Sequence, residues 1–230
     1  MQDVKQLMET AQYAAIEAGK AIMEVYNSGD FSTSMKKDKS PLTSADKNSH
    51  RIITEYLGKT NLPVLSEEGI NIPYKDRKEW EYFWMIDPLD GTKEFINKNG
   101  EFTVNIALMY KNTAIGGVIY VPCDDILYYG SSETGIYKKE EGKLIPFSPL
   151  DERKQFDDLV QKNQLTVAAS RSHLTPETKE FINQFKNVTL VSSGSSLKFM
   201  LLLENRADIY PRLGKTMEWD TPVLDRKSVV

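Results

Sequence analysis

Apolar residues recur at intervals of three and four near the N-terminus, the spacing that places side chains on one face of a helix. The run begins at Val4 and ends at residues 27–29, Asn-Ser-Gly, and predicts one long amphipathic helix. A second helix is predicted from about 45 to 57, with Gly58 as its stop. The polar segment between them, residues 31–46, predicts a loop or an irregular hairpin.

After Pro63 the pattern changes to short apolar segments separated by turn residues. Such segments are typical of strands that pair with their neighbours in the chain. We therefore expect an antiparallel sheet that carries the two helices. The predicted strands are residues 63–68, 82–87, 102–110, 114–122, 126–131 and 135–140.

The rest of the chain alternates strands with helices, an order that favours a second and more parallel sheet. The strands are residues 165–170, 188–193 and 207–212, and the helices are residues 176–185 and 195–205. The acidic stretch 151–158 is expected to be a solvated connection between two halves. We expect one compact unit with an N-terminal half, residues 1–155, and a C-terminal half, residues 156–230.

Composition excludes several classes of protein. In 230 residues, 40% are hydrophobic and 27% are charged, which is ordinary for a globular chain, and no apolar run approaches the roughly 20 residues that cross a bilayer. The N-terminus carries Asp3 and Glu9 and no continuous apolar segment, so we expect no secretory signal and a cytoplasmic location. A single cysteine, Cys123, excludes an internal disulfide and a multi-thiolate metal site, and is interpreted as a core residue.

A net charge of -4 argues against a general nucleic-acid surface, which needs a basic face. An anionic ligand would then have to be bound by local cations or by metal ions. No nucleic-acid partner is expected.

The stretch WMIDPLDGTKEF is the strongest candidate for chemistry. Alone, Asp87-Pro88-x-Asp90-Gly91 is most often an ordinary turn. Here, however, it follows an apolar strand, which would place both carboxylates at the carboxyl edge of a sheet, and a helical turn after it could present free N–H groups to an anion. Clustered carboxylates repel each other unless a cation lies between them, and oxygen ligands suit Mg²⁺.

Four further acidic residues are each unremarkable alone. Glu67 and Glu68 form an acidic turn after a predicted strand, whereas Asp46 and Asp220 are plausible helix caps or first-turn acids. These acidic residues become stronger candidates for a functional site only if one family contains all of them in this order.

One family does. The ordered motifs PLTSAD, LSEEG, DPLDGTKEF, GEFTVNIAL, SRSH, GSSLKF, YPR and EWDT resemble the inositol monophosphatase superfamily of metal-dependent phosphatases. Within it the sequence is most similar to the 3'(2'),5'-bisphosphate nucleotidases of the CysQ type, because lysine and glutamate follow D-G-T where inositol monophosphatases tend to read T-N-F. The resemblance runs from the first helix to Thr221 and implies an α+β fold, a layered αβαβα sandwich.

The resemblance also implies roles for individual residues. Two or three Mg²⁺ ions would be held by Glu67, Asp87, the Leu89 carbonyl, Asp90 and Asp220. Thr92 and Asp46 would activate the attacking water, which Glu67 helps to hold. The substrate would be bound by Gly91, Thr92, His173, Gly194, Ser195, Lys198, Arg212 and Asp220, with Lys198 or Arg212 as the cation for a second phosphate.

The implied activity is removal of the 3'-phosphate from adenosine 3',5'-bisphosphate to give AMP, in support of sulfate assimilation, with the related phosphosulfate as a further substrate and lithium as an inhibitor. Hydrolysis of inositol monophosphate or fructose bisphosphate stays open as an alternative.

One departure from the family lies after W-D-T, where a further helix and strands are expected but the chain reads PVLDRKSVV. We therefore expect a truncated or variant C-terminal part. This leaves open a weakly catalytic phospho-ligand-binding protein and a homodimer that covers the edge of the sheet. Separately, the expected cytoplasmic location leaves open peripheral association with the inner face of a membrane.

Overall fold

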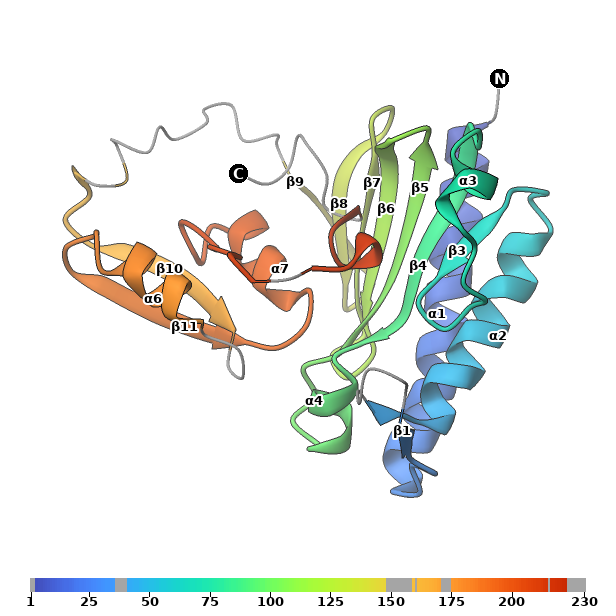
Figure 1. Cartoon of the computed structure of the whole chain (residues 1–230), viewed down its shortest axis with the longest axis horizontal. Helices are drawn as coiled ribbons and strands as arrows, with labels where there is room; N and C mark the ends of the chain where they lie inside the picture. Colours follow the sequence, from blue (N-terminus) through green and yellow to red (C-terminus); the bar gives the residue numbers. More distant parts are fainter. Residues whose placement is uncertain are drawn as a thin grey trace.

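The computed structural model of the protein describes residues 3–35, 41–147, 159, 161–170, 175–214 and 216–222. These residues form five successive layers (Figure 1): a pair of helices, a seven-stranded sheet, a short helix, a two-stranded sheet and an outer helix. The layers confirm the expected α+β sandwich. The proposed boundary at residue 155 lies outside the described residues, and the division into two halves stays a prediction.

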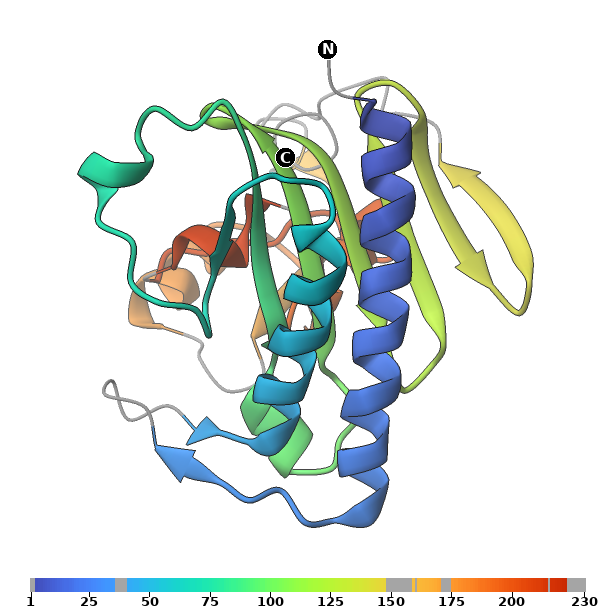
Figure 2. The same ribbon diagram turned by 90° about the vertical axis from the view of Figure 1, so that its right-hand side faces the viewer.

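Helices α1 (Val4–Ser28) and α2 (Ser44–Gly58) lie side by side on one face of the larger sheet (Figure 2). The Asp3 side chain accepts a hydrogen bond from the Gln6 N–H at 3.1 Å and caps the first helix. Gly29, with φ of 75°, ends it in the left-handed conformation.

Both helices match the apolar spacing of the sequence. In the segment that connects them, short strands β1 (Ser34–Met35) and β2 (Pro41–Leu42) pair antiparallel.

The larger sheet has the order β3-β4-β5-β6-β7-β8-β9. Its strands are β3 (Val64–Ser66), β4 (Tyr82–Asp90), β5 (Thr103–Tyr110), β6 (Thr113–Val121), β7 (Ile126–Ser131), β8 (Gly135–Glu140) and β9 (Lys143–Phe147). Short helices α3 (Tyr74–Arg77) and α4 (Thr92–Ile96) precede and follow β4.

Two expectations about this sheet are corrected. The sheet is not antiparallel throughout, because β3 and β4 are parallel, with Ser66 paired to Ile86. The connection through α3 returns the chain to the start of β4, so the two strands run in the same direction. Strand β9 was also not expected; it pairs with β8 across the tight turn at Glu141 and Gly142, although Leu144 and Ile145 are exposed and give little hydrophobic alternation.

Small residues bring α1 close to the sheet. Ala11, Ala15 and Ala18 are fully buried on the face of the helix that contacts the strands. A Cβ atom added at Gly19 would lie 2.3 Å from the Tyr120 ring, so only glycine fits there. This close approach lets the large side chains of the sheet, such as Trp84, fill the space between the layers.

The remaining layers come from the end of the chain. Strands β10 (Leu165–Ser170) and β11 (Val188–Ser193) are parallel, joined by α6 (Pro176–Ile182), as the alternating pattern predicts. Leu165 and Val167 pack against α6, whereas Ala168 points to the opposite face and contacts α7 (Leu197–Leu203). Helix α7 therefore lies between the two sheets (Figure 1).

The two helices of this half are shorter than expected, and the third strand is reduced to one bridge between Val167 and Ile209. A short 3₁₀ helix, η1 (Glu218–Asp220), follows and packs Trp219 on the larger sheet. The acidic stretch 151–158, expected as a solvated connection, lies outside the described residues.

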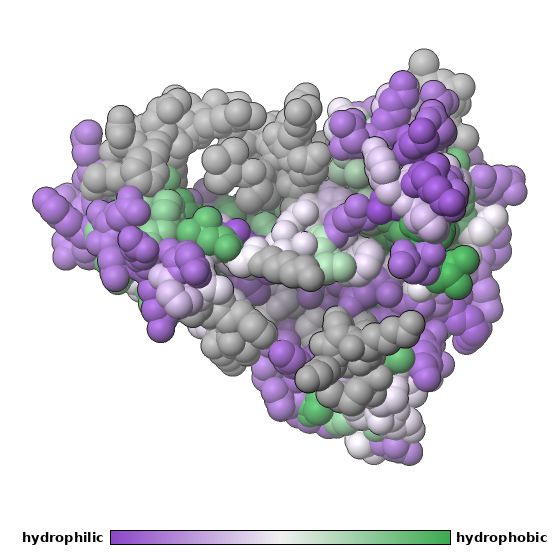
Figure 3. Space-filling model, viewed as in Figure 1, coloured by the Kyte–Doolittle hydropathy of each residue, from purple (hydrophilic) through white to green (hydrophobic). Residues whose placement is uncertain are grey.

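The surface seen in Figure 3 is mostly hydrophilic, and its hydrophobic patches are small and separate. Within the described ranges, no helix is both long enough and apolar enough to cross a membrane. Cys123, expected in the core, is partly buried beside Met23, with 3.8 Å between the two sulfur atoms.

Glu204, which follows α7, ties this helix to the larger sheet. Its Oε1 accepts hydrogen bonds from the Tyr128 hydroxyl at 2.7 Å and from Lys138 Nζ at 2.8 Å. Burial by itself would raise the pKa of the carboxyl group, but the hydrogen bonds from Lys138 and Tyr128 outweigh it, so the pKa of Glu204 lies below its usual value. The fold therefore favours the ionised carboxylate.

We expect Glu204→Gln to lower the free energy of unfolding at pH 7 by about 1–3 kcal/mol, because charged hydrogen bonds are lost. A depressed pKa in the folded state contributes stability above the unfolded value of about 4.3, and this contribution is lost as the pH falls through the folded value. Urea titrations should therefore show the gap between wild type and variant shrinking at about pH 3. Glu133→Gln, at an exposed position, serves as control. If the difference in unfolding free energy between wild type and Glu204→Gln were the same at pH 7 and about pH 3, the lowered pKa of Glu204 would be contradicted.

Candidate active site

The carboxylates of the DPLD motif lie at the end of β4. Alternation along the strand puts Phe83, Met85 and Asp87 on the face opposite α1 and α2. The expectation that the strand ends at Asp87 is wrong, because pairing with β5 resumes at Asp90 after a register shift. Pro88 lacks an N–H group, so an irregularity at this point is physically reasonable.

The parallel pairing of β3 with β4 brings Glu67 to the same place. The Glu67 N–H donates to the Ile86 carbonyl at 3.2 Å, which places Glu67 close to Asp87. Asp87 is only 3% exposed. Burial, followed by the nearby charges of Glu67 and Asp90, raises the pKa of Asp87 well above its usual value. A cation at this point would relieve the repulsion.

Helix α2 supplies Asp46, which lies fully buried in its first turn. The Thr43 hydroxyl and N–H both donate to Asp46 Oδ2, at 2.6 and 2.7 Å. The Thr92 hydroxyl, from the start of α4, lies 3.2 Å from Asp46 Oδ1. Ser49, one turn further along α2, donates to the Pro88 carbonyl at 2.6 Å and holds the helix against the motif.

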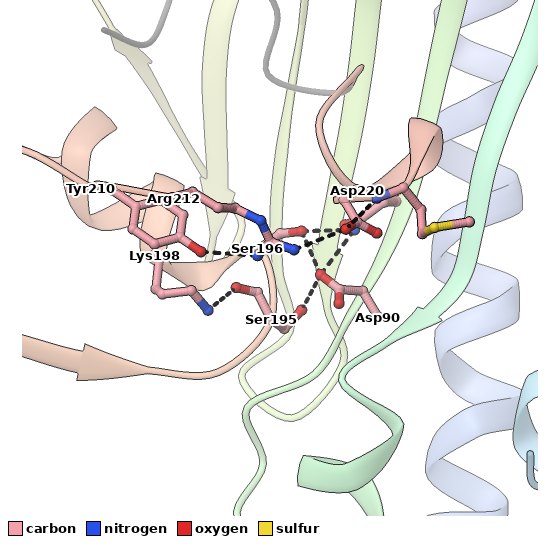
Figure 4. A network of polar contacts seen from close by, with 9 residues as sticks. Asp90, Ser195, Ser196, Lys198, Tyr210, Arg212 and Asp220 are labelled. Atoms are coloured by element: carbon pink, nitrogen blue, oxygen red, sulfur yellow. Dashed lines mark hydrogen bonds and ion pairs between the residues drawn. The ribbon is translucent and has the colours of Figure 1, made fainter. Parts of the chain in front are cut away.

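Asp90 connects the larger sheet to the loop between β11 and α7 (Figure 4). The hydroxyls of Ser195 and Ser196 each donate to Asp90 Oδ2 at 2.7 Å. Asn105 on β5 donates to Ser196 Oγ at 2.8 Å and to Asp90 at 3.3 Å. The predicted metal ligand Asp90 and the predicted substrate residue Ser195 are therefore in direct contact.

Asp220 is the third residue of η1 and accepts from the Met217 N–H at 3.0 Å, so it is not the N-cap of this turn. Arg212 Nη2 lies 2.9 Å from Asp220 Oδ2, and Arg212 Nη1 donates to the Tyr210 hydroxyl at 3.1 Å. Burial raises the pKa of Asp220, and the hydrogen bond from Met217 and the charge of Arg212 oppose it. Asp220, the predicted metal ligand, is thus paired with Arg212, the cation predicted to bind the substrate.

Lys198 is 3% exposed, unlike an ordinary lysine on an amphipathic helix. Its Nζ donates to the carbonyls of Ser193 and Ser195 at 3.1 and 2.6 Å and lies 5.5 Å from the centre of the Tyr210 ring. Burial lowers the pKa of Lys198, while the charge of Asp90 opposes this. Its role at a second phosphate stays a prediction.

Gly91 and Gly194, the two glycines of the predicted substrate site, both pack against the turn at Glu101. A Cβ atom at Gly91, whose φ is 93°, would lie 3.0 Å from the Glu101 carbonyl oxygen and 3.2 Å from Ser195 Cβ. Gly194 is equally close to Glu101. His173, the remaining predicted substrate residue, lies outside the described residues.

Four polar residues at the site were not anticipated: Thr43, Ser49, Asn105 and Ser196. Thr43 stands three residues before Asp46, the spacing of a capping box. Asn105 interrupts an apolar strand, and a buried polar residue there is itself a signal of a functional or structural contact. Ser196 belongs to the GSSLKF motif, although no role was assigned to its hydroxyl, and Ser49 carries no comparable local signal.

The acidic group fits a magnesium site in its chemistry. In the part of the chain that the structure describes, no three His, Cys, Asp or Glu side chains already surround a common point as metal ligands. The donors are nevertheless carboxylate and carbonyl oxygens, which Mg²⁺ prefers, and the buried Asp87 lies beside Glu67 and Asp90 with excess negative charge. The residues present therefore fit this ion.

Comparison with known proteins agrees with this geometry. The sequence profile of the Inositol monophosphatase family matches residues 3–222. The chain belongs to the inositol monophosphatase family. Members of this family are metal-dependent phosphatases, and Mg²⁺ is their typical metal.

Several relatives within the family are similar over most of their length. The 3'(2'),5'-bisphosphate nucleotidase CysQ of Salmonella typhimurium is 41% identical over 218 residues, which cover 94% of this chain and 84% of the relative. The protein of the same name from Escherichia coli is 42% identical over 210 residues, covering 90% and 80%.

Solved structures of the family share the fold. The crystal structure of CysQ from Bacteroides thetaiotaomicron, a bacterial member of the family, superposes with a TM-score of 0.77 at 42% identity, covering 94% of this chain and 83% of that one. Inositol monophosphatase from Anabaena has a TM-score of 0.71 at 21% identity, covering 96% and 80%, and at this identity shows the likeness of fold alone.

Removing the Ser196 hydroxyl should destabilise the protein, because Asp90 loses a donor and the buried Asn105 amide loses an acceptor. We expect Ser196→Ala to lower the free energy of unfolding by about 1–3 kcal/mol, as measured by urea denaturation. Ser132→Ala on the exposed turn after β7 is the matched control, expected to stay within about 0.5 kcal/mol of wild type. Equal losses in the two variants would refute the contact.

Proposed function

We propose that this protein is a Mg²⁺-dependent phosphatase that hydrolyses the 3'-phosphate of adenosine 3',5'-bisphosphate to give AMP and phosphate, and so supports sulfate assimilation. One observation carries the proposal: Asp87 is buried near Glu67 and Asp90 while Thr92 hydrogen-bonds Asp46, in a chain 41% identical over 94% of its length to a 3'(2'),5'-bisphosphate nucleotidase. The carboxylates support the chemistry and the relatives support the substrate.

The metal would be held by four carboxylates from three separate parts of the fold, together with one carbonyl. These are Glu67 after β3, Asp87 and Asp90 on β4, the Leu89 carbonyl between them, and Asp220 in η1. When bound, two or three Mg²⁺ ions would supply positive charge to the phosphoryl oxygens and the leaving oxygen, and would lower the pKa of the attacking water. Arg212 and the Met217 N–H both bind Asp220 Oδ2, so Oδ1 is the oxygen that Asp220 would offer to the ion.

Thr92 and Asp46 would orient the water and receive its proton. Because both donors on Thr43 occupy Asp46 Oδ2, Oδ1 is the oxygen that faces Thr92. The Thr92 hydroxyl donates to Asp46 and keeps a lone pair to accept a hydrogen bond from water. As the water attacks phosphorus, the bond from phosphorus to the ribose 3' oxygen breaks. The leaving oxygen then takes a proton from solvent water and becomes the 3'-hydroxyl.

The substrate would lie between the DGT turn and the loop before α7. Gly91 and Thr92 would approach the transferred phosphate, and Gly194 and Ser195 would approach the nucleotide. Arg212, whose side chain is 36% exposed, is the cation better placed to reach a second phosphate, since Lys198 is only 3% exposed. His173, the phosphosulfate substrate and lithium inhibition stay predictions from the resemblance.

Oligomeric state and location are separate expectations. A homodimer, a cytoplasmic location and association with the inner face of a membrane would each leave the chemistry described above unchanged. They rest on the sequence alone.

Purified protein with Mg²⁺ should release phosphate faster from adenosine 3',5'-bisphosphate than from inositol monophosphate or fructose 1,6-bisphosphate, in a colorimetric phosphate assay. We expect a ratio of kcat/KM of at least about tenfold, because a second phosphate and a base offer additional contacts in the transition state. Faster release from either competitor would overturn the substrate assignment. Tight calorimetric binding of the nucleotide without turnover would instead favour a phospho-ligand-binding protein.

The metal assignment has its own test in Asp87→Asn. Without Mg²⁺ this variant should melt at the same or a higher temperature than wild type, because a buried carboxyl beside two others is neutralised without a change of shape. Addition of Mg²⁺ should raise the melting temperature of wild type but not of the variant, and kcat should fall at least about a hundredfold.

Asp124→Asn, on the exposed turn after β6, is the matched control and should respond to Mg²⁺ as wild type does. An equal Mg²⁺-dependent shift in Asp87→Asn would remove Asp87 from the ligand set.

A further inference from the structure

The turn at Glu101 lies between two glycine turns that come from different parts of the chain. A Cβ atom at Gly91 would lie 3.0 Å from the Glu101 carbonyl oxygen, and one at Gly194 would lie 2.9 Å from the same oxygen. The Glu101 N–H itself donates to Asn99 Oδ1 at 3.0 Å, which shapes the turn locally. The segment before β5 is therefore packed directly against both the DGT turn and the loop before α7.

The side chain of Glu101 reaches further into that loop. Its Oε2 accepts from the Gly194 N–H at 2.8 Å, a hydrogen bond between residues 93 positions apart in the chain. From the other side, Lys198 Nζ donates to the carbonyls of Ser193 and Ser195. An acidic and a basic side chain thus hold consecutive backbone groups of one short loop, and charged partners make these hydrogen bonds strong.

The held loop places two hydroxyls on one carboxylate oxygen. Ser195 has φ of 47°, a left-handed conformation that is unfavourable for serine and persists only where the surroundings enforce it. In this conformation Ser195 Oγ lies 2.7 Å from Thr103 Oγ1 and 2.7 Å from Asp90 Oδ2. Ser196 Oγ lies 2.7 Å from the same oxygen. A shift of Gly194 would move both hydroxyls.

We propose that Glu101 is a positioning residue: through the Gly194 N–H it holds Ser195 and Ser196 against Asp90, and thereby sets the affinity for the nucleotide. The inference rests on the proposed function, because the loop is assigned to the nucleotide there. Glu101 makes no contact with the reacting atoms in this proposal; its effect passes through the backbone of the loop.

The test compares Glu101→Ala, which removes the acceptor, with Glu101→Gln, whose amide oxygen can still accept from Gly194. Glu133→Ala, on an exposed turn, is the control for loss of a surface charge. Each protein is first melted to confirm that it folds. Hydrogen exchange at the Gly194 amide is then followed by NMR, and KM and kcat for adenosine 3',5'-bisphosphate are measured with Mg²⁺.

In Glu101→Ala we expect exchange at Gly194 to be about tenfold faster and KM about tenfold higher, with kcat within about threefold of wild type. Glu101→Gln should stay within about threefold of wild type in all three measurements. If the alanine variant does not fold, Glu101→Leu takes its place, because leucine keeps most of the side-chain volume but has no acceptor for the Gly194 N–H.

Unchanged exchange at Gly194, unchanged KM, or a glutamine variant as impaired as the alanine variant would each overturn the inference. A wild-type protein that releases no phosphate from the nucleotide would overturn the proposed function instead. In that case the exchange rate at Gly194 alone decides whether Glu101 holds the loop.

Discussion

Repulsion between carboxylates is the constraint on which this site depends, because the fold gathers several of them near one end of β4 and buries Asp46 and Asp87. Each has a different local partner. Asp46 is held by Thr43, Asp90 by two serine hydroxyls, and Asp220 by Arg212. The pKa of Asp87 is raised well above its usual value, first by burial and then by the nearby charges of Glu67 and Asp90. These partners stabilise the individual carboxylates, and the group as a whole remains suited to a divalent cation.

The layered architecture is what brings these partners together. Parallel pairing of β3 with β4 sets Glu67 beside Asp87, and α2 delivers Asp46 from the opposite face of the sheet. The loop before α7 then reaches Asp90 because α7 is packed between the two sheets. Small residues along α1 and the hydrogen bonds of Glu204 help to set the spacing of these layers. Packing far from the carboxylates therefore contributes to their geometry.

Much of the fold could be predicted from local pattern. The spacing of apolar residues in α1 and α2, and the short apolar runs of β7 and β10, are strong signals because each of these elements buries apolar side chains. The pattern failed where burial is weak or pairing is irregular. Strand β9 is exposed and forms because β8 supplies its partner, and β4 continues past Pro88 because pairing with β5 resumes at Asp90. Neither partner can be read from the strand itself.

The sequence by itself determined which residues are candidates for chemistry, because the acidic motifs and their order are local and specific. It also determined the family, through motifs distributed along nearly the whole chain. Only the tertiary structure decided which of these residues meet. The contact of Ser195 with Asp90 joins positions 105 apart, and that of Glu101 with Gly194 joins positions 93 apart. Such contacts depend on how the layers pack, and packing is a property of the folded chain as a unit.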